Sequence, residues 1–177
     1  VIPANNPLSV EGIALGRKLF YDPILSGDGT QACADCHRQE NAFTDSLKFS
    51  IGIDGSIGTR NSMPLYNMAW NYNEKFFWDG RAISLEDQAF DPVTNPIEMN
   101  NTWPNAVASL QADGEYPSLF LEAFGTSSID SILVTKAIAQ FERTIVSANS
   151  KFDRYSLGQE ELTSQELNGL NIFLDEG

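Results

Sequence analysis

Residues 33–37 of this chain have the sequence Cys-Ala-Asp-Cys-His and contain both of its cysteines and its only histidine. In a C-x-x-C-H motif, the two thiols add to the vinyl groups of a haem and the adjacent imidazole ligates the iron. The spacing matters because the two sulfur atoms must reach neighbouring vinyl groups while the histidine lies under the ring centre. The motif therefore predicts one covalent haem c, attached to Cys33 and Cys36, with His37 as the proximal iron ligand.

Three other interpretations of this motif compete with haem attachment. A C-x-x-C pair can be a dithiol redox site, although such sites usually lie near a βαβ pattern, which this sequence lacks. A zinc site would need a fourth ligand, and there is no second cluster of cysteine or histidine. A disulfide between Cys33 and Cys36 is the third alternative. We favour haem because the one histidine occupies the position that attachment requires.

The composition is that of an acidic globular protein. The chain has 177 residues, 42% hydrophobic and 20% charged, which suffices for one domain with a core and excludes disordered and collagen-like classes. Eleven Lys and Arg against 24 Asp and Glu give a formal net charge of −13. Such a surface repels phosphate backbones, so we expect no nucleic-acid binding and favour a basic protein partner. There is no run of 18 apolar residues, so no membrane span is expected.

The start of the chain and the motif together bear on cellular location. The sequence begins at Val1 without a basic region followed by an apolar one, so we expect a removed leader or a start within a longer sequence. Bacteria attach haem to C-x-x-C-H outside the cytoplasm, so the motif predicts a periplasmic protein.

Two helices are predicted from apolar spacing and caps. Ser9 is a candidate N-cap for a helix over 9–21, which Asp22-Pro23 ends. Apolar residues at steps of four predict the best helix of the chain over 128–148.

The remaining helices are shorter or lie at the end of the chain. A capping box at Thr163 opens a last helix, whose Leu167, Leu170, Phe173 and Leu174 are expected to face inward. Short helices are expected over 84–90, 102–112 and 118–124, with interruptions at Asp91-Pro92 and Asn95-Pro96.

Residues 22–64 are rich in Gly, Asp, Ser and Thr and predict a long loop region. Such a loop in a compact domain is usually functional or wrapped around something, and a haem would let it complete an apolar core. Strand signals are weak throughout, so the expected fold class is all-α with long loops.

Seven segments that together form a family pattern occur along the chain. They are LGRKLFYDPILSGDGT (15–30), CADCH (33–37), NAFTD (41–45), GTRNSMPLYN (58–67), FFWDGRA (76–82), DQAFDPVTNPIEM (87–99) and AIAQFERTIVSANSKFDRY (137–155). In this order they resemble the bacterial di-haem cytochrome c peroxidase family, which includes the MauG-type cofactor-maturation enzymes. The resemblance implies that residues 1–177 form a single cytochrome c-like haem domain, the N-terminal half of a di-haem peroxidase. The second haem domain would then lie outside residues 1–177.

The resemblance also implies an activity. In the family, this domain reduces hydrogen peroxide with electrons from a small cytochrome c or a cupredoxin. Glu98 matches the distal acid–base carboxylate, and Gln88 matches a glutamine that orients peroxide by hydrogen bonding. From the residue alone, Glu98 would be a solvated loop acid.

The resemblance also implies roles for four other residues. Trp78 matches a tryptophan between the two haems and would relay electrons, with core packing as the alternative. Asn61 matches a residue near a calcium ion between the two domains. Arg60 and Arg81 are candidates to pair with the haem propionates, with loop bracing as the alternative.

One departure from the family pattern concerns the far side of the iron. Many members have a second histidine in the loop before the Arg-Asn pair, and residues 50–61 contain none. Ligation by two histidines is therefore excluded. The iron would be open, water-bound or capped by Met63, Met68 or Met99.

The main expectation is therefore a haem peroxidase that reduces hydrogen peroxide to water. Two alternatives remain open. One is MauG-like oxidation of a partner protein's side chains, which an open iron would also suit. The other is a non-catalytic electron-transfer cytochrome c with a filled iron site.

Overall fold

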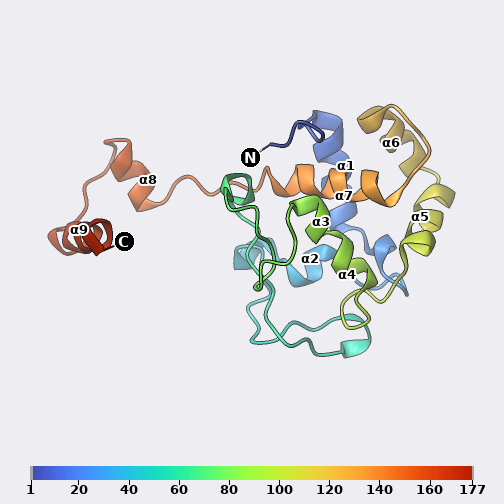
Figure 1. The fold of residues 1–177 in the computed structure, drawn as a ribbon, viewed down its shortest axis with the longest axis horizontal. Helices are drawn as coiled ribbons and strands as arrows, with labels where there is room; N and C mark the ends of the chain where they lie inside the picture. Colours follow the sequence, from blue (N-terminus) through green and yellow to red (C-terminus); the bar gives the residue numbers. More distant parts are fainter. Residues whose placement is uncertain (1, 177) are drawn as a thin grey trace. The chain divides into compact units, whose positions relative to one another are not determined.

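The computed structural model describes residues 2–176 and divides the chain into two compact units, Val1–Ile145 and Val146–Gly177 (Figure 1). The helices of the first unit are α1 (Val10–Tyr21), η1 (Pro23–Leu25), α2 (Cys33–Cys36), η2 (Gln39–Asn41), η3 (Ile53–Gly55), η4 (Met68–Trp70), α3 (Leu85–Gln88), α4 (Phe90–Thr94), α5 (Trp103–Ala112), α6 (Tyr116–Phe124) and α7 (Ser131–Glu142). The second unit has α8 (Lys151–Ser156) and α9 (Ser164–Glu176). Pairing between extended segments is limited, within residues 2–176, to isolated bridges. The expected all-α fold class is confirmed.

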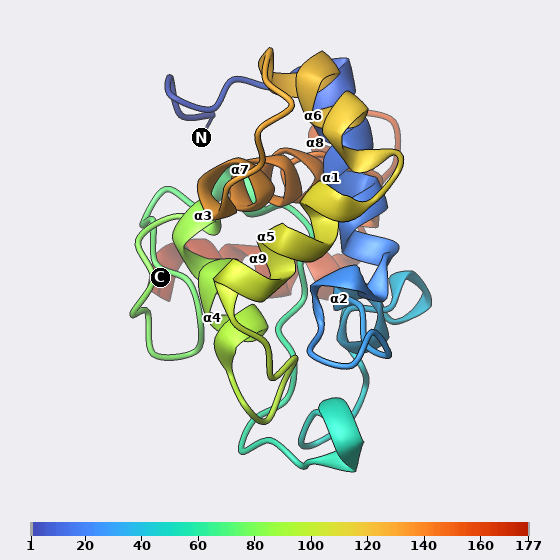
Figure 2. The same cartoon turned by 90° about the vertical axis from the view of Figure 1, so that its right-hand side faces the viewer.

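The centre of the first unit is the crossing of α1 and α7 (Figure 2). A Cβ atom on Gly16 would lie 1.9 Å from the carbonyl oxygen of Ala137, so only glycine permits this approach. Ser9 Oγ accepts a hydrogen bond from Gly12 N at 3.0 Å and caps α1, while the Ser9 N–H donates to Gln140 Oε1 on α7 at 3.0 Å. Ser9 thus determines where α1 begins and also connects this end of the helix to α7.

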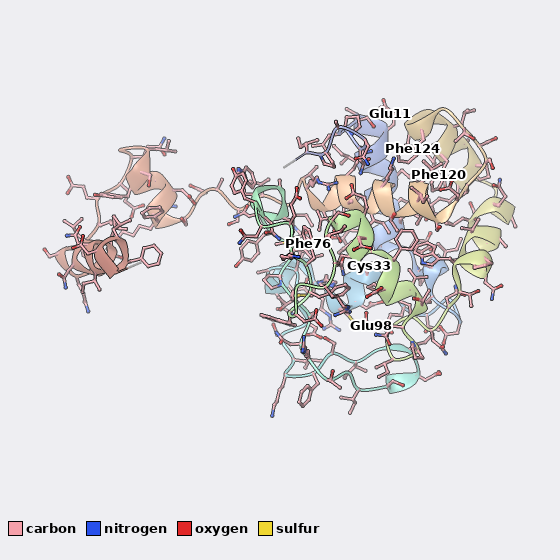
Figure 3. All side chains as sticks on the ribbon, in the orientation of Figure 1. Glu11, Cys33, Phe76, Glu98, Phe120 and Phe124 are labelled. Carbon is pink, nitrogen blue, oxygen red and sulfur yellow. The ribbon has the colours of Figure 1, made fainter. Side chains whose placement is uncertain are left out.

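Residues of α1 and α7 belong to two apolar clusters. The larger one joins α1 and α7 to α5 and α6, with Phe120 fully buried and shown on α6 in Figure 3. The smaller one consists of Phe20, Leu65, Phe141 and Ile145, with Cys33, Ala34 and Phe43 packed against it. The second cluster therefore fixes the C-x-x-C-H helix to the end of the α1–α7 pair.

The helix predicted over 9–21 is confirmed, because α1 follows the Ser9 cap and ends at Tyr21. The helix predicted over 128–148 is shorter than expected. Asp130 caps α7 at its start, and α7 ends at Glu142. Beyond it, the Ile145 carbonyl accepts a hydrogen bond from Asn67 N at 2.8 Å, so the chain leaves the helix to pair with a loop.

Two helix boundaries predicted from proline positions differ from the structure by a few residues. The expected interruption at Asp91-Pro92 lies instead at Ala89, between α3 and α4, and Pro92 occupies the first turn of α4. Pro117 likewise lies inside the start of α6, which begins at Tyr116. In both helices the reason is the same, because a first-turn N–H has no intrahelical partner and proline is tolerated there.

In the second unit, the predicted capping box is confirmed: Thr163 N donates to Glu166 Oε2 at 2.8 Å and Glu166 N donates to Thr163 Oγ1 at 3.3 Å. The expectation that the apolar residues of this helix face inward is wrong, since Phe173 is 72% and Leu174 68% exposed. No side chain described between 146 and 175 is buried, because two short helices form no core by themselves. Among residues 2–176, no helix combines the length and the apolar character needed to span a bilayer.

Candidate functional site

The loops between α1 and α5 enclose a cavity of about 400 Å³ in the first unit. This volume falls in the range of roughly 300–1,000 Å³ that is typical of ligand and cofactor sites. Its walls include every candidate catalytic, haem-binding and calcium-binding residue singled out from the sequence, namely Cys33, Cys36, His37, Arg60, Asn61, Trp78, Arg81, Gln88 and Glu98. Met63 and Met99 also line it, whereas Met68 lines a different cavity. The structure thus brings together residues that are up to 65 positions apart, from Cys33 to Glu98.

The one-turn helix α2 presents the two thiols of the motif to this cavity. The Asp35 carboxylate accepts a hydrogen bond from the Ala32 N–H at 2.8 Å and stabilises the helix start. Because Cys33 and Cys36 are three residues apart in a helical turn, they lie on the same face. Both thiols are free and half-buried.

The charge state of these thiols bears on the alternatives to haem. Burial raises the pKa of Cys33 to about 12 and that of Cys36 to about 11. Dithiol redox sites require a lowered thiol pKa, so this environment is unsuitable for that chemistry. Within residues 2–176 there is also no group of three or more His, Cys, Asp or Glu that could hold a metal ion alone. Both observations favour a cofactor that bonds to the sulfur atoms.

His37 has the hydrogen bonding expected of a metal ligand. Its Nδ1 lies 2.9 Å from the Phe43 carbonyl oxygen, which assigns Nδ1–H as the donor and Nε2 as the nitrogen that would ligate a metal. The Met63 backbone also hydrogen-bonds the imidazole. Ala42 and Phe43 have positive φ angles of 56° and 59°, and this left-handed backbone turns the carbonyl toward the ring. Burial lowers the pKa of His37, so the imidazole is neutral, as ligation requires.

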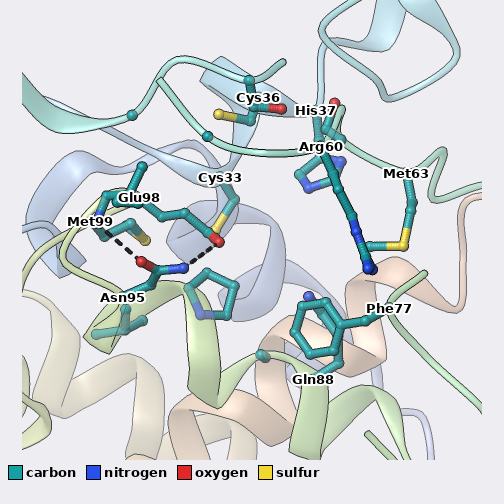
Figure 4. A pocket seen from close by; sticks show the side chains of 18 of the residues that line it. Cys33, Cys36, His37, Arg60, Met63, Phe77, Gln88, Asn95, Glu98 and Met99 are labelled. Carbon is teal, nitrogen blue, oxygen red and sulfur yellow. Dashed lines mark hydrogen bonds between the residues drawn. The ribbon is translucent and has the colours of Figure 1, made fainter. Parts of the chain in front are cut away.

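Glu98 enters the cavity from the loop after α4 and is held at both its side chain and its backbone. Its Oε1 accepts a hydrogen bond from Asn95 Nδ2 at 2.7 Å (Figure 4). Its carbonyl accepts a hydrogen bond from Ile53 N at 2.8 Å, and a Cβ on Gly52 would lie only 1.7 Å from the Ile97 carbonyl oxygen. Residues 50–58 therefore pack directly on the Glu98 segment.

The environment of Glu98 differs from that of a solvated loop acid. The residue is half-buried, and burial raises the pKa of its carboxyl, which the hydrogen bond from Asn95 partly offsets. Figure 4 shows Glu98 and Asn95 on one side of the cavity and Gln88 and Phe77 on another. A small molecule between these sides would meet a carboxyl group and an amide.

The two arginines lie at the cavity rim and share one carboxylate. Arg81 forms ion pairs with Asp79 and Asp91, both at 3.1 Å, and its guanidinium lies 3.6 Å from the Phe77 ring centroid. Arg60 lies 3.9 Å from Asp79. Both side chains are about half exposed, so they remain able to bind an anionic group at the rim.

Trp78 and Asn61 contact each other beside these arginines. The indole Nε1–H donates to the Asn61 carbonyl oxygen at 3.0 Å, and Trp78 is 55% exposed. Trp78 is therefore a surface residue rather than part of the core. The Asn61 side chain donates to the Ser62 carbonyl at 3.3 Å.

The sequence reasoning missed two residues of this cavity wall. Asn95 holds Glu98, whereas its Asn-Pro dipeptide predicts only a helix interruption. Glu142 lines the cavity from α7, is 4% exposed, and has an Oε2 atom without a hydrogen-bond partner among the described residues. Its signal was present, because an acid four residues after Ile138 lies on the apolar stripe of the helix.

The residues present fit a covalent haem. Two free thiols on one helical face, a neutral histidine beside them and a partly apolar cavity match the requirements of c-type attachment. Together with the helical fold, they define the class of the protein as a cytochrome c-like haem-binding domain.

Comparison with known proteins identifies the family. The model of the family "Di-haem cytochrome c peroxidase" matches residues 10–161, and the chain belongs to this family, whose cofactor is haem. It is 39% identical over 98% of its length to cytochrome c peroxidase Ccp of Escherichia coli, and 43% identical over 89% to the methylamine utilization protein MauG of Methylorubrum extorquens.

A solved structure supports the same fold. A MauG-like protein associated with microbial copper homeostasis superposes with a TM-score of 0.87 at 36% identity over 97% of this chain. The expected cytochrome c-like fold is confirmed. The chain spans 37% of the Escherichia coli relative, 44% of the Methylorubrum one and 51% of the MauG-like structure.

Proposed function

We propose that this chain is the peroxide-reducing haem domain of a c-type haem peroxidase, with one haem attached to Cys33 and Cys36 and ligated by His37. The haem, when bound, supplies the iron that exchanges electrons with hydrogen peroxide. The overall reaction joins one hydrogen peroxide, two electrons and two protons to give two waters. The observation that most supports this proposal is that Glu98 and the C-x-x-C-H motif line the same cavity.

Glu98 has the properties of an acid–base group for this reaction. Its carboxylate removes a proton from one oxygen of the bound peroxide and returns it to the other, which then leaves as water. The raised pKa of Glu98 suits both halves of this transfer, because it makes the carboxylate a stronger base for the first half while the protonated group remains an acid for the second. Asn95 fixes the carboxyl, and Gln88 offers an amide to the peroxide from another wall.

The rim residues support haem binding and electron entry. Arg60 and Arg81 would pair with the propionates, since both line the cavity with partly exposed guanidinium groups. The exposed indole of Trp78 would relay electrons, and Asn61 beside it would contribute to a calcium site shared with a second haem domain.

The proposal extends to the partner and the location. A small cytochrome c or a cupredoxin would supply electrons, and a net charge of −13 favours a basic donor. Attachment of haem to C-x-x-C-H supports a periplasmic location.

A second candidate function is MauG-like oxidation of a partner protein's side chains. The observation that favours it is the absence of histidine from residues 50–61, the loop that packs on the Glu98 segment. The 43% identity to a MauG protein supports the same candidate. Both functions need access to the far side of the iron, whereas a purely electron-carrying cytochrome does not.

Steady-state peroxide consumption with a reduced small cytochrome c tests the proposal. Glu98→Gln is expected to lower turnover by roughly 10²-fold or more, the usual contribution of a general acid–base group, without loss of haem. Glu161→Gln, at an exposed position of the second unit, is the matched control and is expected to retain full turnover. Equal turnover of the Glu98→Gln variant and the parent would refute the catalytic role, and reaction only with a partner protein would favour the MauG-like function.

A further inference from the structure

Glu142 is a buried carboxyl group that has no part in the peroxide reduction described above. It lies on the last turn of α7, one turn after Ile138, and both residues line the cavity. Only 4% of Glu142 is exposed, and Oε2 has no hydrogen-bond partner among the described residues. An unpaired buried carboxylate costs several kcal/mol of solvation, so such a group normally binds a proton instead.

The charged and titratable groups around Glu142 supply only a partial counter-charge. The neighbouring Arg143 is held by both oxygens of Glu86 on α3, at 2.7 and 2.9 Å, so most of its charge is directed to that carboxylate. The Cys33 thiol approaches from α2, and it is uncharged both as a thiol and as a thioether. From α1, the residues buried against α7 are uncharged, namely Gly12, Leu15, Gly16, Leu19 and Phe20.

The balance of these effects sets the protonation of Glu142. Burial raises the pKa of Glu142 to about 8, with a partial offset from Arg143 and a further rise from Glu86. The group therefore changes charge near neutral pH, inside the wall of a cavity where electrostatic interactions are stronger than in water.

We propose that Glu142 is the group that takes up a proton when an electron enters this cavity. This inference rests on the haem attachment of the proposed function. With haem bound, a single-electron redox protein would supply one electron to the iron, and one proton from the solvent would bind Glu142 Oε2. The net charge inside the cavity then stays constant, which avoids the cost of adding an uncompensated negative charge to a medium of low dielectric constant.

The physical consequence is a coupling between pH and the reduction potential. The carboxylate form of Glu142 favours the oxidised iron, and the protonated form favours the reduced iron. Raising the pH through the titration of Glu142 therefore lowers the potential. At full coupling, the equilibrium constant for reduction changes tenfold per pH unit, which is ~59 mV for one electron.

The test is a titration of the midpoint potential of the haem-loaded protein against pH. The parent and the control Glu122→Gln, at an exposed position of α6, are expected to show the falling potential. Glu142→Gln is expected to lose that slope, and Glu142→Asp, which keeps a carboxyl, is expected to retain it at a shifted pH. The same pH dependence in Glu142→Gln and the parent would overturn the proposal.

A second measurement covers the case in which Glu142→Gln fails to bind haem. The infrared difference spectrum between reduced and oxidised parent protein should show a protonated carboxyl band on reduction, and Glu142→Asp should shift it. No such band, or a band unchanged by Glu142→Asp, would overturn the proposal. Peroxide consumption is measured separately, so a pH-dependent potential without turnover would refute the proposed function and leave this inference standing.

Discussion

The α1–α7 pair and the loops of residues 22–100 are built in different ways. The two helices bury their apolar residues against each other and against α5 and α6, so the sequence itself supplies both sides of every contact. The loops contain short helical turns and surround a cavity. All eight non-glycine residues with positive φ in the described chain lie between 42 and 100. Strained backbone persists where its surroundings fix it, so we infer that the loops need the bound group to complete their core.

The largest expected effect comes from preventing attachment of that group. Cys33→Ser combined with Cys36→Ser should release residues 22–100 while α1 and α7 remain folded, because the loops supply most of the cavity wall, whereas α1 and α7 also pack against each other and against α5 and α6. Protection of residues 22–100 should fall to the level of an unfolded chain, because a group that stabilises only the folded loops is then missing. Amide hydrogen exchange measures it region by region. Equal loss of protection in residues 22–100 and in α1 and α7 would contradict the inference that only the loops depend on the bound group.

The next effect concerns the buried ion pair that joins α3 to α7. Arg143 and Glu86 have side chains only 5% and 17% exposed, so Glu86→Gln leaves a buried positive charge with weaker partners. The expected loss is about 3–5 kcal/mol in the free energy of unfolding, measured by denaturant titration.

The same pair predicts a pH dependence of stability. Burial alone would raise the pKa of Glu86, but hydrogen bonds from Arg143 and Asn6 lower it overall. Its contribution is therefore present above the unfolded-state pKa and is lost as the pH falls through the lowered folded-state pKa. Acid unfolding of the parent should be steeper than that of Glu86→Gln, and identical acid profiles would argue against the pair as a source of stability.

Gly16 and Gly52 each allow a close approach to a backbone carbonyl oxygen. Gly16 does so where α1 crosses α7, and Gly52 does so in the loops. Gly16→Ala places a Cβ against the Ala137 carbonyl and should cost about 1–3 kcal/mol of stability, measured by thermal unfolding. Gly169→Ala is the matched helical control, because a Cβ there has no heavy atom within 4 Å, and no loss is expected. Equal melting temperatures for Gly16→Ala and the parent would show that the helix crossing is more adaptable than the geometry indicates.

Gly52→Ala should act mainly on activity and has the smallest expected effect. The added Cβ meets the Ile97 carbonyl and displaces the Glu98 segment, so peroxide turnover should fall about tenfold, or ~1.4 kcal/mol in the barrier. Gly114→Ala, with open space around it, is the control. A large loss of stability with unchanged turnover would place Gly52 in the structural framework instead.

The two regions also differ in how far the sequence predicts them. The Ser9 cap and the apolar steps of α7 predict the helix pair because the determinants are local. The end of α7 at Glu142 depends on a hydrogen bond between Asn67 and Ile145, which local periodicity does not contain. The exposure of Phe173 was missed for a related reason, because burial depends on having a partner surface and not on helical spacing.

At the site, motif spacing and family resemblance predict which residues gather around the cavity. They do not predict the orienting contacts, such as Asn95 on Glu98 or the Phe43 carbonyl on His37. These contacts depend on side-chain directions in a loop with left-handed residues. Glu142 was detectable in principle, as a charged residue on an apolar helix stripe.

The central claim is that the Cys33-x-x-Cys36-His37 motif attaches a haem inside this cavity. A haem stain of the denatured protein, with its intact mass, tests this claim most directly. We predict that the parent retains one haem after denaturation and that Cys33→Ser combined with Cys36→Ser retains none. A parent protein without bound haem after expression with the haem-attachment machinery would contradict the account.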